Sequence, residues 1–211
     1  RRLIKYYEYQ INSNENIEVK YEEATFDAIK NGQYDAAIVA IGGATRELNV
    51  PGIDNAMVTY AMDYLGSRKK VNGNKVVVIG GGITGAETAL ELKNEGKDVT
   101  VVEMMDQFLA TPDSASQAYA VEISKTDIKI MLGLRLESVE NNKAILVDRF
   151  GNHKELETDS IVIAAGFTAQ TALTNQLEEE TDMEVYNIGD SERVRQIYEA
   201  VHEGYFTGAL L

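Results

Sequence analysis

Cysteine is missing from this sequence of 211 residues, and histidine occurs only twice. Without cysteine the chain can form no disulfide, hold no cysteine-bound iron–sulfur cluster and carry no redox-active dithiol. His153 lies in a turn-like Gly-Asn-His sequence and His202 in an expected helix, so we interpret both as structural or solvent-exposed. Two histidines cannot form a multi-histidine metal site, and we predict no metal site in this chain.

Basic residues are also scarce, because 20 lysines and arginines stand against 34 aspartates and glutamates, a net charge of −14. This balance argues against nucleic acid or an anionic membrane as a partner. No apolar run has the length of a membrane span and no signal-peptide pattern opens the chain, so we expect a cytoplasmic protein. The chain begins Arg-Arg, without methionine and inside an apparent helix, and we therefore expect a piece of a longer protein.

The glycines of one short stretch have a spacing typical of dinucleotide-binding proteins. Residues 76–79 are a β-branched run with the length of a parallel strand buried on both faces. Gly80, Gly82 and Gly85 follow at once, in the order strand, Gly-x-Gly-x-x-Gly, helix. In this fingerprint Gly80 allows the tight turn, Gly82 lets the backbone approach a pyrophosphate, and Gly85 lets the helix and the strand pack closely.

The residues after the glycines complete a β-α-β unit. Ile83 and Thr84 open the helix, whose free N–H groups and positive dipole end point at the phosphates. A second β-branched run at 99–102 ends at Glu103, about 20 residues beyond the glycines. The Glu103 carboxylate can accept hydrogen bonds from ribose hydroxyls and would repel a 2′-phosphate, and no arginine accompanies Met104 and the three residues after it. We therefore predict an NAD(H) site that prefers NADH to NADPH.

Hydrophobic periodicity and turn residues predict the other elements. Predicted helices occupy residues 3–11, 22–30, 61–65, 114–124 and 193–210. Predicted strands occupy residues 17–21 (half-buried), 34–41 (buried), 128–131, 161–165 (buried) and 185–188. An antiparallel meander is expected at residues 135–140, 143–148 and 154–157, and residues 171–183 are interpreted as acidic and irregular. For the last helix we predict an inner face of Val194, Ile197, Tyr198 and Val201.

Three further strands are predicted to end in glycine, at Gly42, Gly166 and Gly189. In doubly wound sheets the carboxyl ends of the strands line the ligand crevice. Each glycine alone is explained equally well by its turn. Together with Asp190 they are candidate contacts for a second cofactor.

Taken together, these motifs resemble flavoprotein reductases with two dinucleotide-binding domains, in which an NAD(P) domain is inserted into an FAD domain. Lys75–Glu103 matches the NAD(P) fingerprint, and Glu87 occupies the position where the family has a carboxylate near the nicotinamide. Asp35–Gly42 resembles the strand that returns from the FAD domain, although Ile41 replaces the family's threonine. Residues 161–167 resemble the strand that re-enters that domain, without the Pro-Asn that often follows it. Residues 185–190 resemble the late FAD motif, whose aspartate contacts the ribityl or pyrophosphate region.

The resemblance implies an α/β fold in which a Rossmann-like NAD(P)-binding domain with an antiparallel β-meander is inserted into an incomplete FAD-binding Rossmann-like domain. The expected regions are 1–56 for the first FAD segment, 57–158 for the NAD(P) domain and 159–211 for the second FAD segment. The chain is most similar to the C-terminal half of NADH:flavin oxidoreductases related to Old Yellow Enzyme, such as 2,4-dienoyl-CoA reductase, 2-enoate reductase and NADH oxidases of that type. Residues 46–55 and 188–204 support this. FMN and an iron–sulfur cluster are implied only for a longer parent enzyme.

The function implied by the resemblance is hydride transfer from NADH to a flavin in the full enzyme, with no catalytic acid, base or nucleophile assigned in this chain. A module that binds nucleotide without catalysis, or has lost the nucleotide, is an alternative, and a methyltransferase is a third one. The sequence has a single strand–GxGxxG–helix unit, so FAD would lack a phosphate cradle here. We predict NADH binding without bound FAD, and sheet edges that a second copy of the chain could cover. The final substrate and the oligomeric state stay open.

Overall fold

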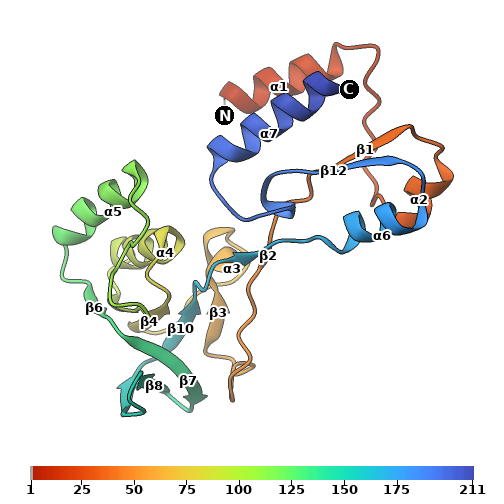
Figure 1. Cartoon of the computed structure of the whole chain (residues 1–211). Coiled ribbons are helices and arrows are strands. Elements are labelled where there is room, and N and C mark those ends of the chain that lie inside the picture. Colours follow the sequence, from red (N-terminus) through yellow and green to blue (C-terminus); the bar gives the residue numbers. More distant parts are fainter. Residues whose placement is uncertain (1) are drawn as a thin grey trace.

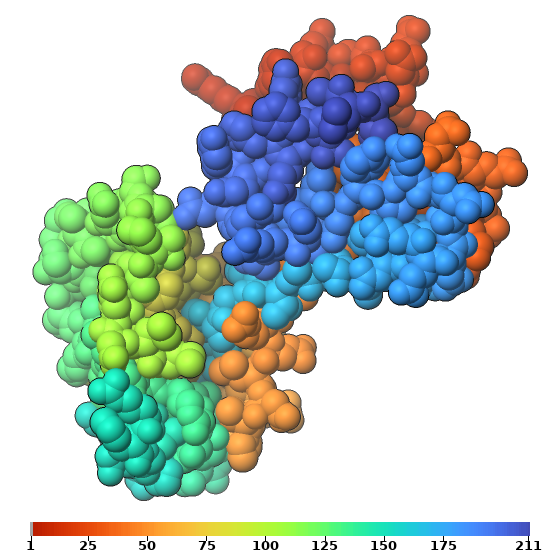
Figure 2. All heavy atoms as spheres, viewed as in Figure 1, coloured from red at the N-terminus to blue at the C-terminus, as the bar shows by residue number. Residues whose placement is uncertain are grey.

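The computed structural model describes residues 2–211 and has two lobes, which appear in the space-filling view as separate masses joined at a waist (Figures 1 and 2). We call residues 46–166 the central lobe, and residues 2–45 with 167–211 the terminal lobe, in which both chain ends lie (Figure 1). The lobes are connected through a short antiparallel ribbon of β2 (Ala44–Thr45) and β11 (Phe167–Thr168).

The central lobe is built on a parallel sheet of five strands in the order β3-β10-β4-β5-β6. Its strands are β3 (Val58–Tyr60), β4 (Lys75–Ile79), β5 (Asp98–Val102), β6 (Lys129–Met131) and β10 (Ser160–Ile163). Its helices are α3 (Ala61–Leu65), α4 (Ile83–Asn94) and α5 (Ser114–Ser124). An antiparallel meander completes the lobe with β7 (Leu134–Glu140), β8 (Lys143–Asp148) and β9 (His153–Glu157).

Apolar residues on both faces of the sheet explain why it lies at the centre of the lobe. On β4, Val76 and Val78 pack on the helix side with Ala86 and Leu92 of α4. The alternate residues Val77 and Ile79 pack against the meander with residues such as Leu146. Each side chain that is fully buried in this way contributes about 1.5–3 kcal/mol, so burial on both faces stabilises the sheet. The predicted α/β Rossmann-like fold with a meander is confirmed.

Two strands of this sheet differ from the sequence-based prediction. β3 was not predicted, because three residues between a loop and a short helix carry too little periodicity. β10 lies between β3 and β4, although the sequence predicts that the chain leaves the NAD(P) region after residue 158. All four β10 residues are buried, and a strand of that kind needs neighbours and cover on both faces, which this sheet supplies. The sheet therefore extends past the predicted boundary.

The terminal lobe contains a parallel pair of strands with helices around it (Figure 1). Its elements are α1 (Arg2–Asn12), α2 (Phe26–Asn31), β1 (Ala36–Val39), α6 (Ala172–Glu180), β12 (Glu184–Asn187), the short 3₁₀ helix Gly189–Ser191 and α7 (Ile197–Leu210). Within residues 2–211, β1 pairs with β12 alone, and the side chain of Ile38 is 42% exposed. The prediction of a strand buried along residues 34–41 is therefore wrong, since only one side of β1 has a strand beside it.

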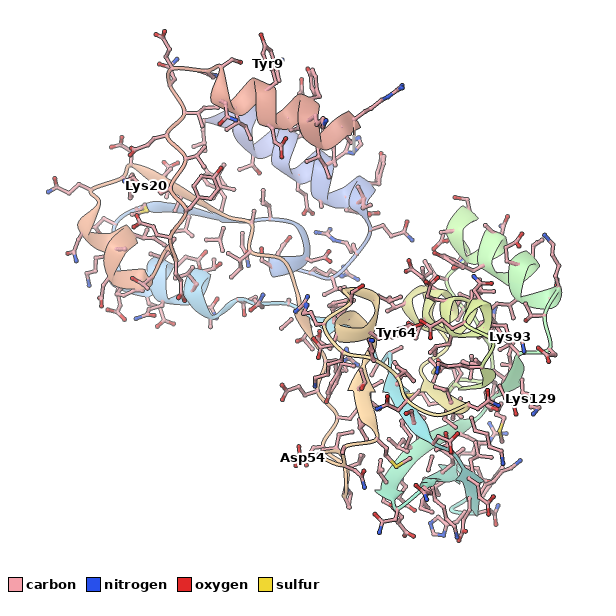
Figure 3. The ribbon with its side chains drawn as sticks, turned by 180° about the vertical axis from the view of Figure 1, so that it is seen from behind. Tyr9, Lys20, Asp54, Tyr64, Lys93 and Lys129 are labelled. Atoms are coloured by element: carbon pink, nitrogen blue, oxygen red, sulfur yellow. The ribbon has the colours of Figure 1, made fainter. Side chains whose placement is uncertain are left out.

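Three other predictions for the terminal lobe are wrong. Residues 17–21 form no strand in the described chain and are exposed, since nothing pairs with them there. Residues 171–183 contain helix α6, which buries Thr174 and Leu177. The last helix begins at Ile197 and not at residue 193, which leaves the half-buried Val194 outside it. The other three residues of its predicted inner face are exposed, with Ile197 at 83%. In the described chain no element covers that face, and Figure 3 shows Tyr9 of α1 likewise pointing away from the molecule.

Candidate functional site

The glycine loop between β4 and α4 requires glycine at two positions for steric reasons. Gly80 has a φ of +113°, and a Cβ there would overlap the carbonyl oxygen of Ala164 on the neighbouring strand end. A Cβ on Gly85 would overlap the carbonyl oxygen of Gly80, so the first turn of α4 lies directly on the loop. Gly82 differs, because a Cβ there would meet no described atom within 4 Å. The backbone at Gly82 is therefore open to a ligand, as a pyrophosphate site requires.

Glu103 is hydrogen-bonded to this loop. One carboxylate oxygen accepts from the backbone N–H of Gly81 at 2.6 Å, and the other accepts from the N–H of Met105 at 2.7 Å. These two bonds hold the carboxylate at the carboxyl end of β5, beside the glycines. Each oxygen keeps a lone pair that can accept from a ribose hydroxyl. The acid that the sequence predicted as the ribose contact thus lies next to the predicted phosphate loop.

A cavity of about 990 Å³ lies at the carboxyl ends of β4, β5 and β10. Its lining includes seven of the predicted site residues: Gly80, Gly82, Ile83, Thr84, Glu103, Met104 and Gly166. The cavity matches the upper end of the volume range of small-molecule sites. An adenine dinucleotide needs backbone N–H groups for its phosphates, an acid for its ribose and apolar walls for its base. The loop, Glu103 and side chains such as Leu134 and Leu136 supply these groups, so the residues present fit NAD(H).

A second cavity, of about 610 Å³, adjoins the first one on the terminal lobe. It brings together Gly42, Gly189 and Asp190, three of the five predicted residues that the first cavity lacks. Three residues line both cavities: Ile83 at the start of α4, and Arg195 and Gln196 before α7. The glycines at 42 and 189 have positive φ values of 74° and 65°, so their backbone can turn sharply there. The residues fit the middle of an extended cofactor, but they include no glycine loop for its phosphates.

The side chains between the two cavities form a connected polar network. Arg195 pairs with Glu203 of α7 and with Glu192, and its backbone N–H donates to Asp190 at 3.0 Å. Glu203 also accepts from the N–H of Gly189 at 2.8 Å. The carboxylate of Asp190 is thus already engaged with the chain, which fixes the turn after β12.

One hydrogen bond joins the two lobes directly across the cavities. The side-chain amide of Gln196 donates to Asp113 at 2.7 Å. Asp113 caps α5 by accepting from the N–H of Ser116 at 2.7 Å, and Gln196 caps α7 together with Glu199. The Ser116 N–H and then the Gln196 amide keep the pKa of the Asp113 carboxyl below its ordinary value. The Asp113 carboxylate is therefore ionised at neutral pH and can accept the Gln196 amide.

Two predicted site residues lie elsewhere. Gly85 is buried beneath the loop, where it acts through packing. Glu87 is exposed on α4 and lies outside the described lining of both cavities, so its role near a nicotinamide stays a prediction. Sequence analysis missed Arg46, Arg135, Arg195 and Gln196, which come from three distant segments. A signal for Gln196 was present, because Gln196 and Glu199 have the spacing of a capping box.

Among residues 2–211 there is no cluster of three or more histidine, cysteine or acidic side chains that could hold a metal ion. No helix in the described chain is both long and apolar enough to cross a membrane.

Comparison with known proteins also identifies a class that binds pyridine nucleotides. Residues 4–204 match the family described as pyridine nucleotide-disulphide oxidoreductase. Cinnamate reductase from Clostridium sporogenes is 32% identical over 97% of this chain and 31% of its own length. A nitric oxide reductase FlRd-NAD(+) reductase from Vibrio vulnificus is 36% identical over 48% of the chain and 27% of its length. The structure of a 2-naphthoyl-CoA reductase complex with 2-naphthoyl-CoA has a TM-score of 0.85 at 32% identity, covering 99% of this chain and 32% of that one.

The chain thus spans about a third of the length of these relatives. The match covers both lobes and includes the glycine loop, Glu103 and the turn at Gly189. The family binds FAD and NAD(P) and consists of flavoprotein oxidoreductases. The chain belongs to the pyridine nucleotide-disulphide oxidoreductase family.

Proposed function

We propose that this chain binds NADH in the larger cavity and orients it toward a flavin that occupies the smaller one in a longer enzyme. The observation that carries the proposal is the open backbone at Gly82 beside the Glu103 carboxylate, within a cavity that adjoins the turn at Gly189. When both cofactors are bound, the nicotinamide supplies two electrons and the flavin accepts them.

The chain's own residues bind and orient the nucleotide. The N–H groups at the start of α4 and the backbone at Gly82 hold the pyrophosphate, while Glu103 accepts from the adenine ribose. Ile83, Arg195 and Gln196 line both cavities and would therefore lie between the two cofactors. Their position suits them to exclude water from the space where the reactive rings meet.

The parent protein proposed here is a reductase of the type related to Old Yellow Enzyme. The 97% coverage of this chain by cinnamate reductase supports that proposal, as does the 99% coverage by 2-naphthoyl-CoA reductase. FMN and an iron–sulfur cluster belong to the proposal only for such a longer parent. The division of this chain into residues 1–56, 57–158 and 159–211 is also a proposal. Strand β10 belongs to the third of these segments and pairs within the central sheet.

One observation favours a second candidate, a module that binds nucleotide without turnover. The smaller cavity contains no glycine loop for flavin phosphates, so the isolated chain has an incomplete flavin site. NADH oxidation by the purified chain, followed at 340 nm with FAD or FMN added as acceptor, separates the two candidates. Turnover above the rate without protein supports the reductase. Saturable NADH binding without turnover supports the module, and a lack of NADH binding contradicts both.

A further inference from the structure

Two charged side chains border the Glu103 end of the larger cavity, and a third one lies beside the second. Glu103 and Arg135 both line it. The backbone joins them, because the N–H of Leu134 donates to the carbonyl oxygen of Glu103 at 3.1 Å and Arg135 is the next residue. Arg135 thus follows a residue that is bonded to the backbone of Glu103 and lines the same cavity, although it comes more than thirty positions later in the sequence.

The guanidinium of Arg135 is held, loosely, by a third residue. One Nη atom lies 3.8 Å from Oε1 of Glu137, and 57% of the Arg135 side chain is exposed. Glu137 itself is fixed by a second contact, because its Oε2 lies 2.7 Å from Nε2 of His153 on β9. Arg135 is therefore the more exposed partner of this pair, and Glu137 has the additional contact.

Glu137 lies in a β-bulge of β7. The register between β7 and β8 shifts between Leu136 and Ser138, so Glu137 is the extra residue without a partner on β8. Bulges redirect a side chain and are frequent beside binding sites. Residues two apart on a strand share a face, and the bulge leaves Glu137 beside the arginine that borders the cavity without a cross-strand partner.

We propose that Arg135 and Glu137, together with Glu103, determine how strongly the chain discriminates between NADH and NADPH. The proposal rests on the proposed nucleotide-binding function and extends its specificity beyond the fingerprint acid. A 2′-phosphate at the ribose would meet the Glu103 carboxylate, which repels it. Arg135 is placed to offset that repulsion with a charge-assisted hydrogen bond, and Glu137 competes with the phosphate for the same guanidinium.

The expected effects follow from the exposure of the pair. An exposed ion pair is worth about 1 kcal/mol at most, so Glu137→Gln should tighten NADPH binding by about two- to fivefold and leave NADH unchanged. Glu103→Gln combined with Glu137→Gln removes both competing charges. We expect at least a tenfold gain in NADPH affinity relative to NADH, since hydrogen bonds to charged groups contribute about 1.5–3 kcal/mol.

The test measures the Kd values of NADH and NADPH by calorimetric titration for the wild type, the single variant, the double variant and the double variant with Arg135→Met. Loss of the NADPH gain on adding Arg135→Met supports the proposal. Two control variants remove one negative and one positive charge from residues outside the lining of the cavity. They are Glu140→Gln, on the same strand as Glu137, and Arg149→Met, where the Arg149 guanidinium lies 3.4 Å from the Asp106 carboxylate. These controls should leave the ratio of the two Kd values unchanged.

Two results would overturn the inference. The inference is contradicted if the double variant leaves the ratio of the NADH and NADPH Kd values unchanged, or if the gain in NADPH affinity persists after Arg135→Met. In either case NADH binding by the wild type still supports the proposed function. A wild type that binds neither nucleotide contradicts the proposed function itself, and this inference with it.

Discussion

Replacing Gly82 with aspartate should separate nucleotide binding from folding. Gly82 has a φ of −80°, which any residue adopts, and its Cβ direction is free of described atoms within 4 Å. It is also the N-cap residue of α4, a position that aspartate favours. The variant therefore adds a side chain and a negative charge where a pyrophosphate would approach, without a steric cost to the protein.

Gly82→Asp should weaken NADH binding but stabilise the fold. A carboxylate about 4 Å from a phosphate charge costs about 4 kcal/mol at an effective dielectric constant of about 20, which corresponds to roughly a thousandfold loss of NADH affinity. The same charge at a helix N-terminus stabilises the helix by about 0.3–1 kcal/mol, so the melting temperature should rise by about 1–3 °C.

Calorimetric titration with NADH and thermal unfolding without ligand measure the two quantities on the same preparation. Gly82→Asn is the matched control, because asparagine also caps a helix but adds no charge. We expect the asparagine variant to bind NADH at least tenfold more tightly than the aspartate variant. Unchanged NADH affinity in a folded Gly82→Asp variant would refute the assignment of this loop as a phosphate site.

Further predictions concern the same lobe. Glu103→Gln should narrow the preference for NADH over NADPH, since the neutral amide no longer repels a 2′-phosphate, and equal wild-type Kd values in competition titrations would argue against this role. Gly85→Ala should lower the free energy of unfolding by about 1–3 kcal/mol in urea titrations, because its Cβ meets the Gly80 carbonyl oxygen, and an unchanged value would contradict the close approach. The N–H groups of Lys75 and then Asn74 hold the pKa of Asp159 below its ordinary value. The ionised carboxylate therefore stabilises the fold at any pH above the ordinary pKa of aspartate, and this stabilisation is lost as the pH falls through the lowered pKa. Asp159→Asn should therefore weaken the loss of stability below about pH 4, and identical acid-unfolding curves for the two proteins would contradict the prediction.

The central lobe could be predicted from sequence because its signals are local. Residues 75–103 combine an apolar run, a glycine spacing and a helical period within one β-α-β unit, and each signal agrees with the others. The meander was readable for the same reason, since turns such as Asn141-Asn142 separate its strands. The helix at 114–124 matches α5 at both ends.

The terminal lobe was harder to predict because its apolar residues are not covered within the described chain. Ile38 and Ile197 look like core residues in sequence, yet both are exposed. Helix α6 was missed because Glu178, Glu179 and Glu180 dominate the composition of its last turn, although Leu177 packs inward at helical spacing.

The residues of the candidate site also divide into those that a local sequence motif reveals and those that it does not. The glycines and Glu103 belong to one contiguous motif and could be found locally. Arg46, Arg135 and Arg195 reach the cavity from the segment just after β2, from the meander and from the turn before α7. Only the tertiary arrangement brings them together, so no local pattern could identify them.

The central claim, that Gly80–Gly85 is the NADH site of a chain whose flavin site is incomplete, is tested most directly by one titration. The purified chain is first examined by absorption at 450 nm for bound flavin and is then titrated with NADH in a calorimeter. The account predicts a colourless protein that binds NADH at one site, with binding lost in Gly82→Asp. A yellow preparation with stoichiometric flavin that fails to bind NADH would contradict it, because the glycine loop would then hold the flavin.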